Sequence, residues 1–191
     1  FRAALPLFRA RGFAGTAIGE LGEAAGAGAT NVGRYFDSKE QILVDVYDRV
    51  GAQVEVGLAT AVREATGAAD ALERMLHAYC AIAFEAADLV VVVSDNRGAI
   101  PTDERPRLRR RDRRVMDLWH AVIAEARPEL RRVEVDTLVT GVLPIVNMYP
   151  QQLSGALPAP AEVVSLVEAF LRGGAQAAPI RGCADRRHLP M

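Results

Sequence analysis

The amino-acid sequence predicts an all-α protein of about nine helices. Apolar residues recur at helical spacing along nearly the whole 191-residue chain. Capping residues and glycines stand where these stripes begin and end, as with Ser38 followed by Gln41, and with Gly12 and Gly26. The β-branched run LVVVVS at 89–94 has no partner strand and is therefore expected to be a short buried helix.

The first part of the chain predicts three short helices followed by a long one. The short helices are expected at residues 1–11, 16–26 and about 29–35. Thr16 can cap the second of them. Ser38 opens the long helix, whose apolar stripe continues to about Glu64.

The remaining sequence predicts further helices separated by loops. TGAAD at 66–70 and NRGAIPTDERP at 96–106 carry the glycine, proline and polar residues of loops. The helices are expected at residues 70–87, 89–94, 107–127, 133–148 and 160–172. From Gly173 onward the glycine, proline and arginine content predicts a flexible tail.

Residues 16–36 have the spacing of a helix-turn-helix, with glycine in a tight turn between two short helices. A helix that enters the major groove needs a small polar outer face, and Ala29, Thr30 and Asn31 supply one. The side chains expected to bond phosphates are Thr16, Arg34, Tyr35 and Lys39. An ordinary three-helix bundle has the same spacing, so the spacing leaves both alternatives open.

The stretch RGFAGTAIGELGEAAGAGATNVGRYFDSKEQIL, residues 11–43, resembles the N-terminal domain of the TetR family of bacterial repressors. The positions that match the family pattern are Gly12, Phe13, Thr16, Ala25, Gly26, Tyr35, Phe36, Ser38, Lys39 and Leu43. Residues 94–130 bear a looser resemblance to the C-terminal domains of some actinobacterial members. We therefore expect a DNA-binding domain at residues 1–50, a ligand-binding and dimerisation domain at 51–175, and a flexible tail at 176–191.

Two glycines depart from the family pattern. Gly33 stands where the family usually has a tyrosine that contacts a phosphate, and Gly28 stands where serine is preferred as a helix cap. We favour the interpretation that DNA binding is weaker and that Tyr35, Lys39 and arginines compensate. Two alternatives stay open: the glycine lets the backbone approach the DNA more closely, or the protein has drifted from strong DNA binding.

The resemblance implies an effector pocket among the helices of the second domain. The candidate pocket residues are Tyr79, Phe84, Met116, Trp119 and Asn147. Core packing is the simpler interpretation for any single one of them, because apolar stripes at helical spacing are usually core. Seven arginines lie between residues 105 and 114, and an ion-paired, solvated helix start is their default interpretation. The alternative is a phosphate site, for instance for an acyl-CoA effector.

The helices at 133–148 and 160–172 carry more apolar surface than the outer helices of a monomer need. The candidate dimer-interface residues are Leu138, Val142, Val163, Val167 and Phe170. The resemblance implies the same arrangement, because in that family the last two long helices of each subunit form a four-helix interface. We therefore expect a homodimer.

Composition and motif content argue against other classes of protein. No apolar run reaches the roughly 20 residues of a membrane span. The two cysteines are far apart and form neither a disulfide framework nor a zinc motif, so we expect a cytoplasmic protein without metal or cofactor. The three histidines lack metal-ligand spacing and no nucleophile motif is present, so we expect no enzyme activity.

The sequence thus predicts a ligand-responsive transcriptional repressor. With a net charge of −1, its affinity for double-stranded DNA must come from a local patch. We expect it to bind a palindromic operator as a homodimer and to be released by a small apolar or amphipathic effector. The alternative is a helical ligand-binding dimer with weak or lost DNA binding.

Overall fold

The computed structural model describes Leu7, residues 11–24, Gly26, Phe36, residues 38–152 and the positions Glu162, Ser165 and Ala169. Within these residues every regular element is helical, which confirms the predicted all-α class. The helix expected at 29–35 and most of the one expected at 160–172 lie outside the described residues. The predicted total of about nine helices therefore stays a prediction.

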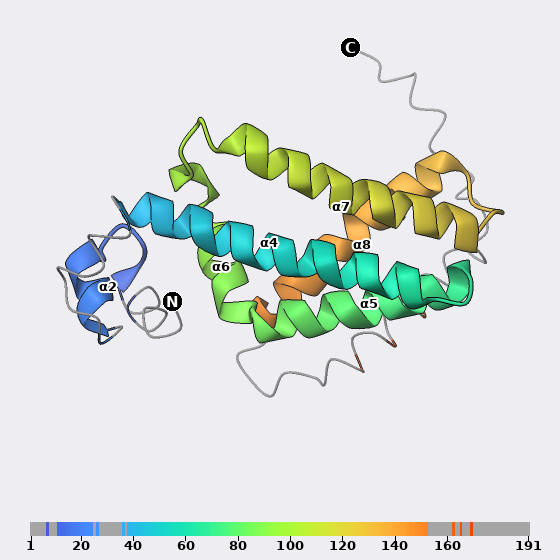
Figure 1. Cartoon of the computed structure of the whole chain (residues 1–191), viewed down its shortest axis with the longest axis horizontal. Helices are drawn as coiled ribbons and strands as arrows, with labels where there is room; N and C mark the ends of the chain where they lie inside the picture. The colour runs from blue at the N-terminus through green and yellow to red at the C-terminus, as the bar shows by residue number, and fades with distance from the viewer. Residues whose placement is uncertain are drawn as a thin grey trace, which may run out of the picture.

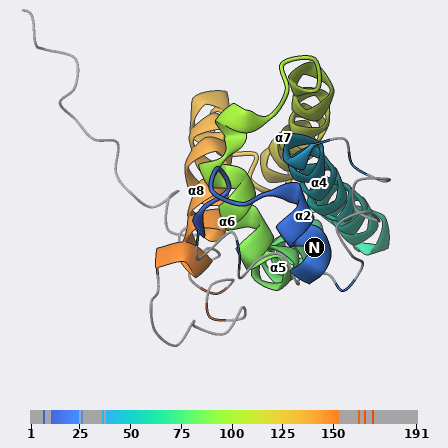
Figure 2. The ribbon, with the colours of Figure 1, turned by 90° about the vertical axis from the view of Figure 1, so that its left-hand side faces the viewer.

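The helices are α2 (Ile18–Ala24), α4 (Lys39–Glu64), α5 (Ala68–Glu85), α6 (Ala87–Asp95), the 3₁₀ turn η2 (Arg97–Ala99), α7 (Arg105–Ala126) and α8 (Arg132–Gln152). Figure 1 shows α2 at one end of the molecule, beside the start of α4, while α4, α5, α7 and α8 run alongside one another. Seen from the α2 end in Figure 2, α6 lies between α8 and the pair formed by α4 and α7. The predicted helix at 89–94 is confirmed as part of α6.

Local sequence signals explain where several of these helices begin and end. Gly12 and Gly26 have φ values of +70° and +68°, a left-handed conformation that closes helices and that other residues rarely adopt. Ser38 Oγ accepts a hydrogen bond from the backbone N–H of Gln41 at 3.1 Å, which confirms the predicted cap of α4. That helix ends at Glu64, where its apolar periodicity stops.

Thr16, in contrast, does not cap α2. Its hydroxyl donates to the carbonyl oxygen of Gly12 at 2.8 Å, so it belongs to the preceding turn. Glu20 takes the capping role, because its carboxylate accepts the backbone N–H of Ala17 at 2.8 Å. This hydrogen bond and the nearby Arg11 hold the pKa of Glu20 below its usual value.

The loops between the later helices are shorter than the sequence predicts. The helix α5 begins at Ala68 rather than at residue 70, because the Asp70 carboxylate accepts hydrogen bonds from both the N–H and the hydroxyl of Thr66. The helix α7 begins at Arg105, with a proline in its first turn, and α8 continues to Gln152.

The long helix α4 belongs to two hydrophobic clusters. Its first half packs with α2 and the turn before it, with α6 and with the start of α7; the buried members are Phe13, Leu21, Ile42, Leu43, Val44, Val46, Val93, Ile100 and Leu108. Its second half contributes Leu58 and Ala61 to a larger cluster with α5, α7 and α8. The helix therefore links the N-terminal helices to the bundle.

Candidate nucleic-acid interface and effector site

Lys39 joins the start of α4 to the turn before α2. Its ammonium group donates to the carbonyl oxygens of Phe13, Ala14 and Thr16 at 3.0, 2.8 and 3.4 Å. It also lies 5.1 Å from the centre of the Phe13 ring, which is itself buried. A lysine ammonium has three N–H donors, so these three carbonyls occupy all of them.

Two residues that the sequence assigns to phosphate contacts are thus engaged within the protein. Thr16 is 1% exposed, and its hydroxyl bonds the Gly12 carbonyl. Lys39 holds the turn at residues 13–16. In this conformation both side chains position α2 against α4. The other candidate DNA contacts lie outside the described residues: Ala29, Thr30, Asn31, Gly33, Arg34 and Tyr35.

The arginine-rich start of α7 is mostly used to hold neighbouring elements. Arg105 donates to the carbonyl oxygens of Ile100 and Gly98, which secures the preceding loop. Arg107 and Arg111 pair with the Asp48 carboxylate of α4.

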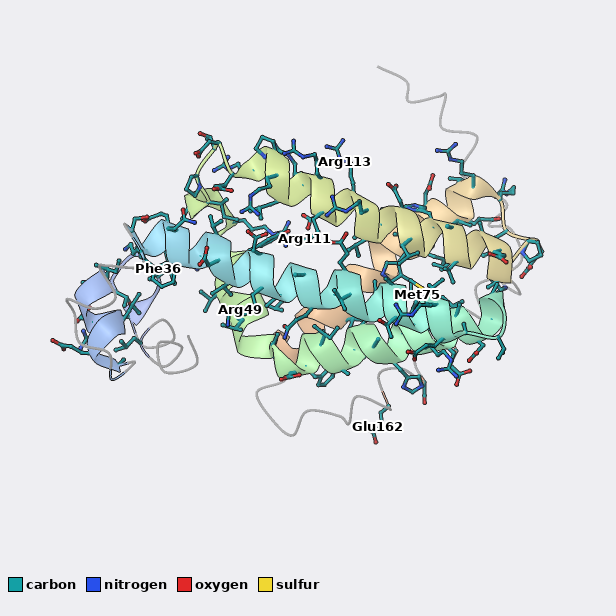
Figure 3. All side chains as sticks on the ribbon, viewed as in Figure 1. Phe36, Arg49, Met75, Arg111, Arg113 and Glu162 are labelled. Carbon is teal, nitrogen blue, oxygen red and sulfur yellow. The ribbon has the colours of Figure 1, made fainter. Side chains whose placement is uncertain are left out.

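Further along the same pair of helices, Arg114 forms a two-point ion pair with Glu55 at 2.7 and 3.2 Å. This pair lowers the pKa of Glu55 below its usual value and raises that of Arg114. The predicted ion-paired helix start is therefore present at Arg107, Arg111 and Arg114. Its outer face is formed by the exposed Arg109, Arg110 and Arg113, the last of which is labelled in Figure 3.

Four of the candidate pocket residues meet in or around the larger hydrophobic cluster. Tyr79 of α5 and Trp119 of α7 are buried in it, with their rings edge to face and 5.9 Å apart. Phe84 and Met116 pack at its margin. The side chain of Asn147 lies outside the described part of the structure, although its backbone belongs to α8.

The indole nitrogen of Trp119 is fully buried, and no described residue accepts a hydrogen bond from it. A buried N–H without an acceptor is uncommon in folded proteins. This feature could not be read from the sequence, because Trp119 has the helical spacing of an ordinary core residue.

A surface groove of about 420 Å³ lies between α4 and α5, away from these residues. Its lining includes Gly57, Ala61, Asp70, Arg74 and His77. The groove could not be read from the sequence, because it depends on how α4 and α5 pack near the loop that joins them. Its walls combine apolar and polar residues, and two of the polar ones, Asp70 and Arg74, pair with each other at 2.8 Å.

The position of Leu138 differs from the prediction of an interface residue. Leu138 is 9% exposed and packs into the core of its own chain, together with Val135 and Val139. The exposed side of α8 instead carries Val133, Thr137, Thr140 and Gly141. The side chain of Val142 and all of Val163, Val167 and Phe170 lie outside the described residues.

Two further expectations concern metals and membranes. Among the described residues, no group of three or more histidine, cysteine or carboxylate side chains is arranged to hold a metal ion. Within the same residues, no helix combines the length and apolarity needed to cross a membrane. Cys80 is buried, and burial raises the pKa of its thiol to about 11.

Comparison with known families identifies the N-terminal part of the chain. Residues 1–46 match the family model described as bacterial regulatory proteins, tetR family. The sequence matches none of the curated proteins. The resemblance that the sequence analysis drew for residues 11–43 is confirmed by this match.

Solved structures of several regulators share this fold over about nine-tenths of the chain. PfmR, a TetR family transcriptional regulator from Thermus thermophilus, is similar with a TM-score of 0.78 at 20% identity, over 89% of this chain and 95% of that one. KstR2, a ketosteroid transcriptional regulator of Mycobacterium tuberculosis, is similar with a TM-score of 0.76 at 17% identity, over 91% of both chains. AibR in complex with isovaleryl coenzyme A and operator DNA is similar with a TM-score of 0.72 at 14% identity, over 88% of this chain and 93% of that one.

Proposed function

We propose that this chain, which carries a TetR-family N-terminal domain on the fold of TetR-family regulators, is a ligand-responsive transcriptional repressor. It binds a palindromic operator as a homodimer, and a small effector with an apolar part releases it. The match of residues 1–46 to the family model is the observation that carries the proposal.

The DNA contacts are assigned to the segment between α2 and α4. Ala29, Thr30 and Asn31 face base edges in the major groove, and Arg34 and Tyr35 bond phosphates. The hydrogen bonds of Lys39 to the turn at residues 13–16 support this assignment, because they fix α2 relative to the start of α4. A recognition helix needs such a rigid support to keep its register in the groove.

The first test is binding to duplexes from the upstream region of the gene. We expect a near-palindromic site to bind the dimer more tightly than random DNA, with half-sites about 34–36 Å apart. Affinity should fall steeply with salt, because phosphate contacts release counterions. Equal affinity for the upstream region and for random duplexes would favour the alternative, a ligand-binding dimer that has lost DNA binding through Gly28 and Gly33.

The dimer interface is assigned to the exposed side of α8. Val133, Thr137, Thr140 and Gly141 recur there at the spacing of one helix face. The hydroxyls of both threonines donate to carbonyls of their own helix, at 2.7 and 2.6 Å. The face therefore presents methyl groups without unpaired donors, and Gly141 has open space around its Cα. Such a face permits close packing of two helices.

Thr137→Arg is expected to convert the dimer into a monomer. The substitution places a cation opposite its own copy across a two-fold axis, so the dissociation constant should rise roughly a hundredfold or more. Thr102→Arg, at an exposed loop position, is the control and should remain dimeric. Sedimentation velocity at micromolar concentration makes the measurement. If the Thr137→Arg variant remains dimeric, the dimer interface does not lie on this face of α8.

The effector site is assigned to the cluster around Tyr79 and Trp119. The residues of this cluster are apolar, as contact with an acyl chain requires, and the buried indole N–H of Trp119 can donate to a carbonyl oxygen of the ligand. The solved AibR complex contains isovaleryl coenzyme A, so short acyl-CoA thioesters are the probes to test first. Since Trp119 is the single tryptophan, its fluorescence reports directly on this site.

A further inference from the structure

We propose that Tyr47 and Asp48 of α4, held by three residues of α7, determine which half-site spacing the operator must have. We call the set Tyr47, Asp48, Arg107, Arg111 and Asp112 the α4 clamp. The proposal rests on the proposed function, because half-sites have meaning only for a dimer that binds DNA. It assigns specificity to residues that do not touch DNA.

The clamp joins two consecutive residues of α4 to one face of α7. The Tyr47 hydroxyl donates to the Asp112 carboxylate at 2.6 Å. Arg111 donates to the backbone carbonyl of Asp48 at 2.7 Å and pairs with its carboxylate at 2.5 Å. Arg107 pairs with the same carboxylate. Figure 3 shows Arg111 in the space between α4 and α7.

Arg111 is the buried member of the clamp. Arg111 is 9% exposed, and its guanidinium group lies directly against the α4 backbone at Gly51. A Cβ atom at that position would be 2.6 Å from Arg111 Nε, so the glycine makes this approach possible. Arg111 Nη1 donates to the Asp48 carbonyl, whereas Nε and Nη2 are buried without a hydrogen-bond partner among the described residues, so the ion pair with the Asp48 carboxylate compensates the buried charge.

The Tyr47 contact persists over the working range of pH. Burial, and then the hydrogen bond to Asp112, raise the pKa of the Tyr47 hydroxyl far above its usual value. The phenol therefore keeps its proton and remains a donor. The guanidinium carbon of Arg97, in η2, lies 5.7 Å from the centre of the Tyr47 ring. Tyr47 therefore contacts η2 as well as α7.

The position of the clamp along α4 makes it a pivot for the N-terminal helices. Asp48 lies nine residues after Lys39, or about 13 Å along the helix axis. A tilt of about 15° at the clamp would move the start of α4 by about 3.4 Å, which is the rise of one base pair. The apolar cluster around Leu43 and Val46 also opposes such a tilt, because its side chains are closely packed, and the clamp adds directional contacts to it.

The pair Glu55–Arg114 provides a matched control on the same two helices. It also joins α4 to α7, with an N–O distance of 2.7 Å, but its side chains are 36% and 59% exposed. Exposed ion pairs contribute little to the position of a helix. Glu55→Gln should therefore leave the geometry of α4 unchanged.

Two variants release the clamp in different ways. Tyr47→Phe removes one hydrogen bond and keeps the ring on which Arg97 lies. The double variant Asp48→Leu with Arg111→Met removes both paired charges together, because removing Asp48 alone would leave the buried Arg111 unpaired and endanger folding. Thermal unfolding first establishes that both variants are folded.

The specificity test measures affinity for operators whose half-sites are one base pair closer, correctly spaced or one base pair farther apart. We expect the unchanged protein and Glu55→Gln to prefer the correct spacing at least about tenfold, because one base pair adds 3.4 Å and about 35° of rotation. Both clamp variants should lower this preference to about threefold or less, because α4 is then freer to tilt. An unchanged preference in both variants would overturn the proposal.

A second measurement does not depend on DNA. Spin labels at Glu23→Cys on α2 and Glu125→Cys on α7 occupy exposed positions, with Cys183 replaced by serine and labelled chains diluted into unlabelled protein. The distance distribution between the labels should be narrow in the otherwise unchanged protein and in Glu55→Gln, and broader in both clamp variants. Equal widths would overturn the clamp. A protein that binds no duplex specifically would contradict the proposed function, and the label distances would still decide whether the clamp exists.

Discussion

Replacing Lys39 with methionine is expected to lower the free energy of unfolding by about 2 kcal/mol without changing the salt dependence of DNA binding. The substitution removes the ammonium group that bonds the carbonyls of Phe13, Ala14 and Thr16 but keeps most of the aliphatic stem. Hydrogen bonds from a charged donor contribute about 1.5–3 kcal/mol each in buried settings, and the partial exposure of this site reduces their sum.

The measurements are thermal unfolding, hydrogen exchange of the α2 amides and operator affinity at several salt concentrations. We expect faster exchange in α2 and a uniformly lower affinity with an unchanged salt slope, because the ammonium is already bound within the protein. Arg63→Met, at the exposed far end of α4, is the control and should change neither exchange nor affinity. A salt slope reduced by about one, with stability unchanged, would show instead that Lys39 contacts a phosphate.

Sequence patterns predicted the fold well wherever the signal is local. The Ser38 cap, the glycines at positions 12 and 26, and the apolar stripe up to Glu64 depend on residues a few positions apart, and the structure has each of them as expected. The run at 89–94 was assigned correctly as a helix because it lacked a partner strand.

The same patterns fail where a polar side chain must choose between partners. Thr16 is a residue type that often caps helices, but its hydroxyl donates to the carbonyl oxygen of Gly12, four residues earlier. Lys39 donates to three carbonyls of a distant turn, which its charge alone did not indicate, and its predicted contact with a phosphate stays a prediction. Both outcomes depend on how two helices approach each other, which hydrophobic periodicity does not encode.

Contacts between distant helices account for the remaining differences. Asp48 and Arg111 are 63 residues apart, and only the register of α4 against α7 brings them together. The sequence of the arginine run therefore left two alternatives open, an ion-paired helix start and a phosphate site. In the structure Arg107, Arg111 and Arg114 form ion pairs with carboxylates of α4. The packing of Leu138 in its own core could not be predicted for a similar reason, because an apolar stripe does not say whether it faces its own core or a second copy, and a role for Leu138 in an interface stays a prediction.

Gly51→Ala is expected to destabilise the protein by about 2 kcal/mol or more, against the usual effect of this substitution in a helix. Alanine normally stabilises a helix interior by up to about 1 kcal/mol relative to glycine. At this position the added Cβ would lie 2.6 Å from Nε and 2.9 Å from Cζ of Arg111. The guanidinium group must move, and its contacts with Asp48 weaken when it does.

A double-mutant cycle tests whether Arg111 is the cause. With Arg111→Met and Asp48→Leu together in the background, so that neither charge is left unpaired, the flexible thioether can move aside, and Gly51→Ala should become neutral or stabilising by about 0.5–1 kcal/mol. The coupling energy between Gly51 and this pair should therefore exceed about 2 kcal/mol, as expected for residues in direct contact. Urea unfolding of the four proteins gives this value. If Gly51→Ala costs the same in both backgrounds, the glycine is required by something other than the guanidinium group of Arg111, and the close approach of α7 to the α4 backbone does not depend on this side chain.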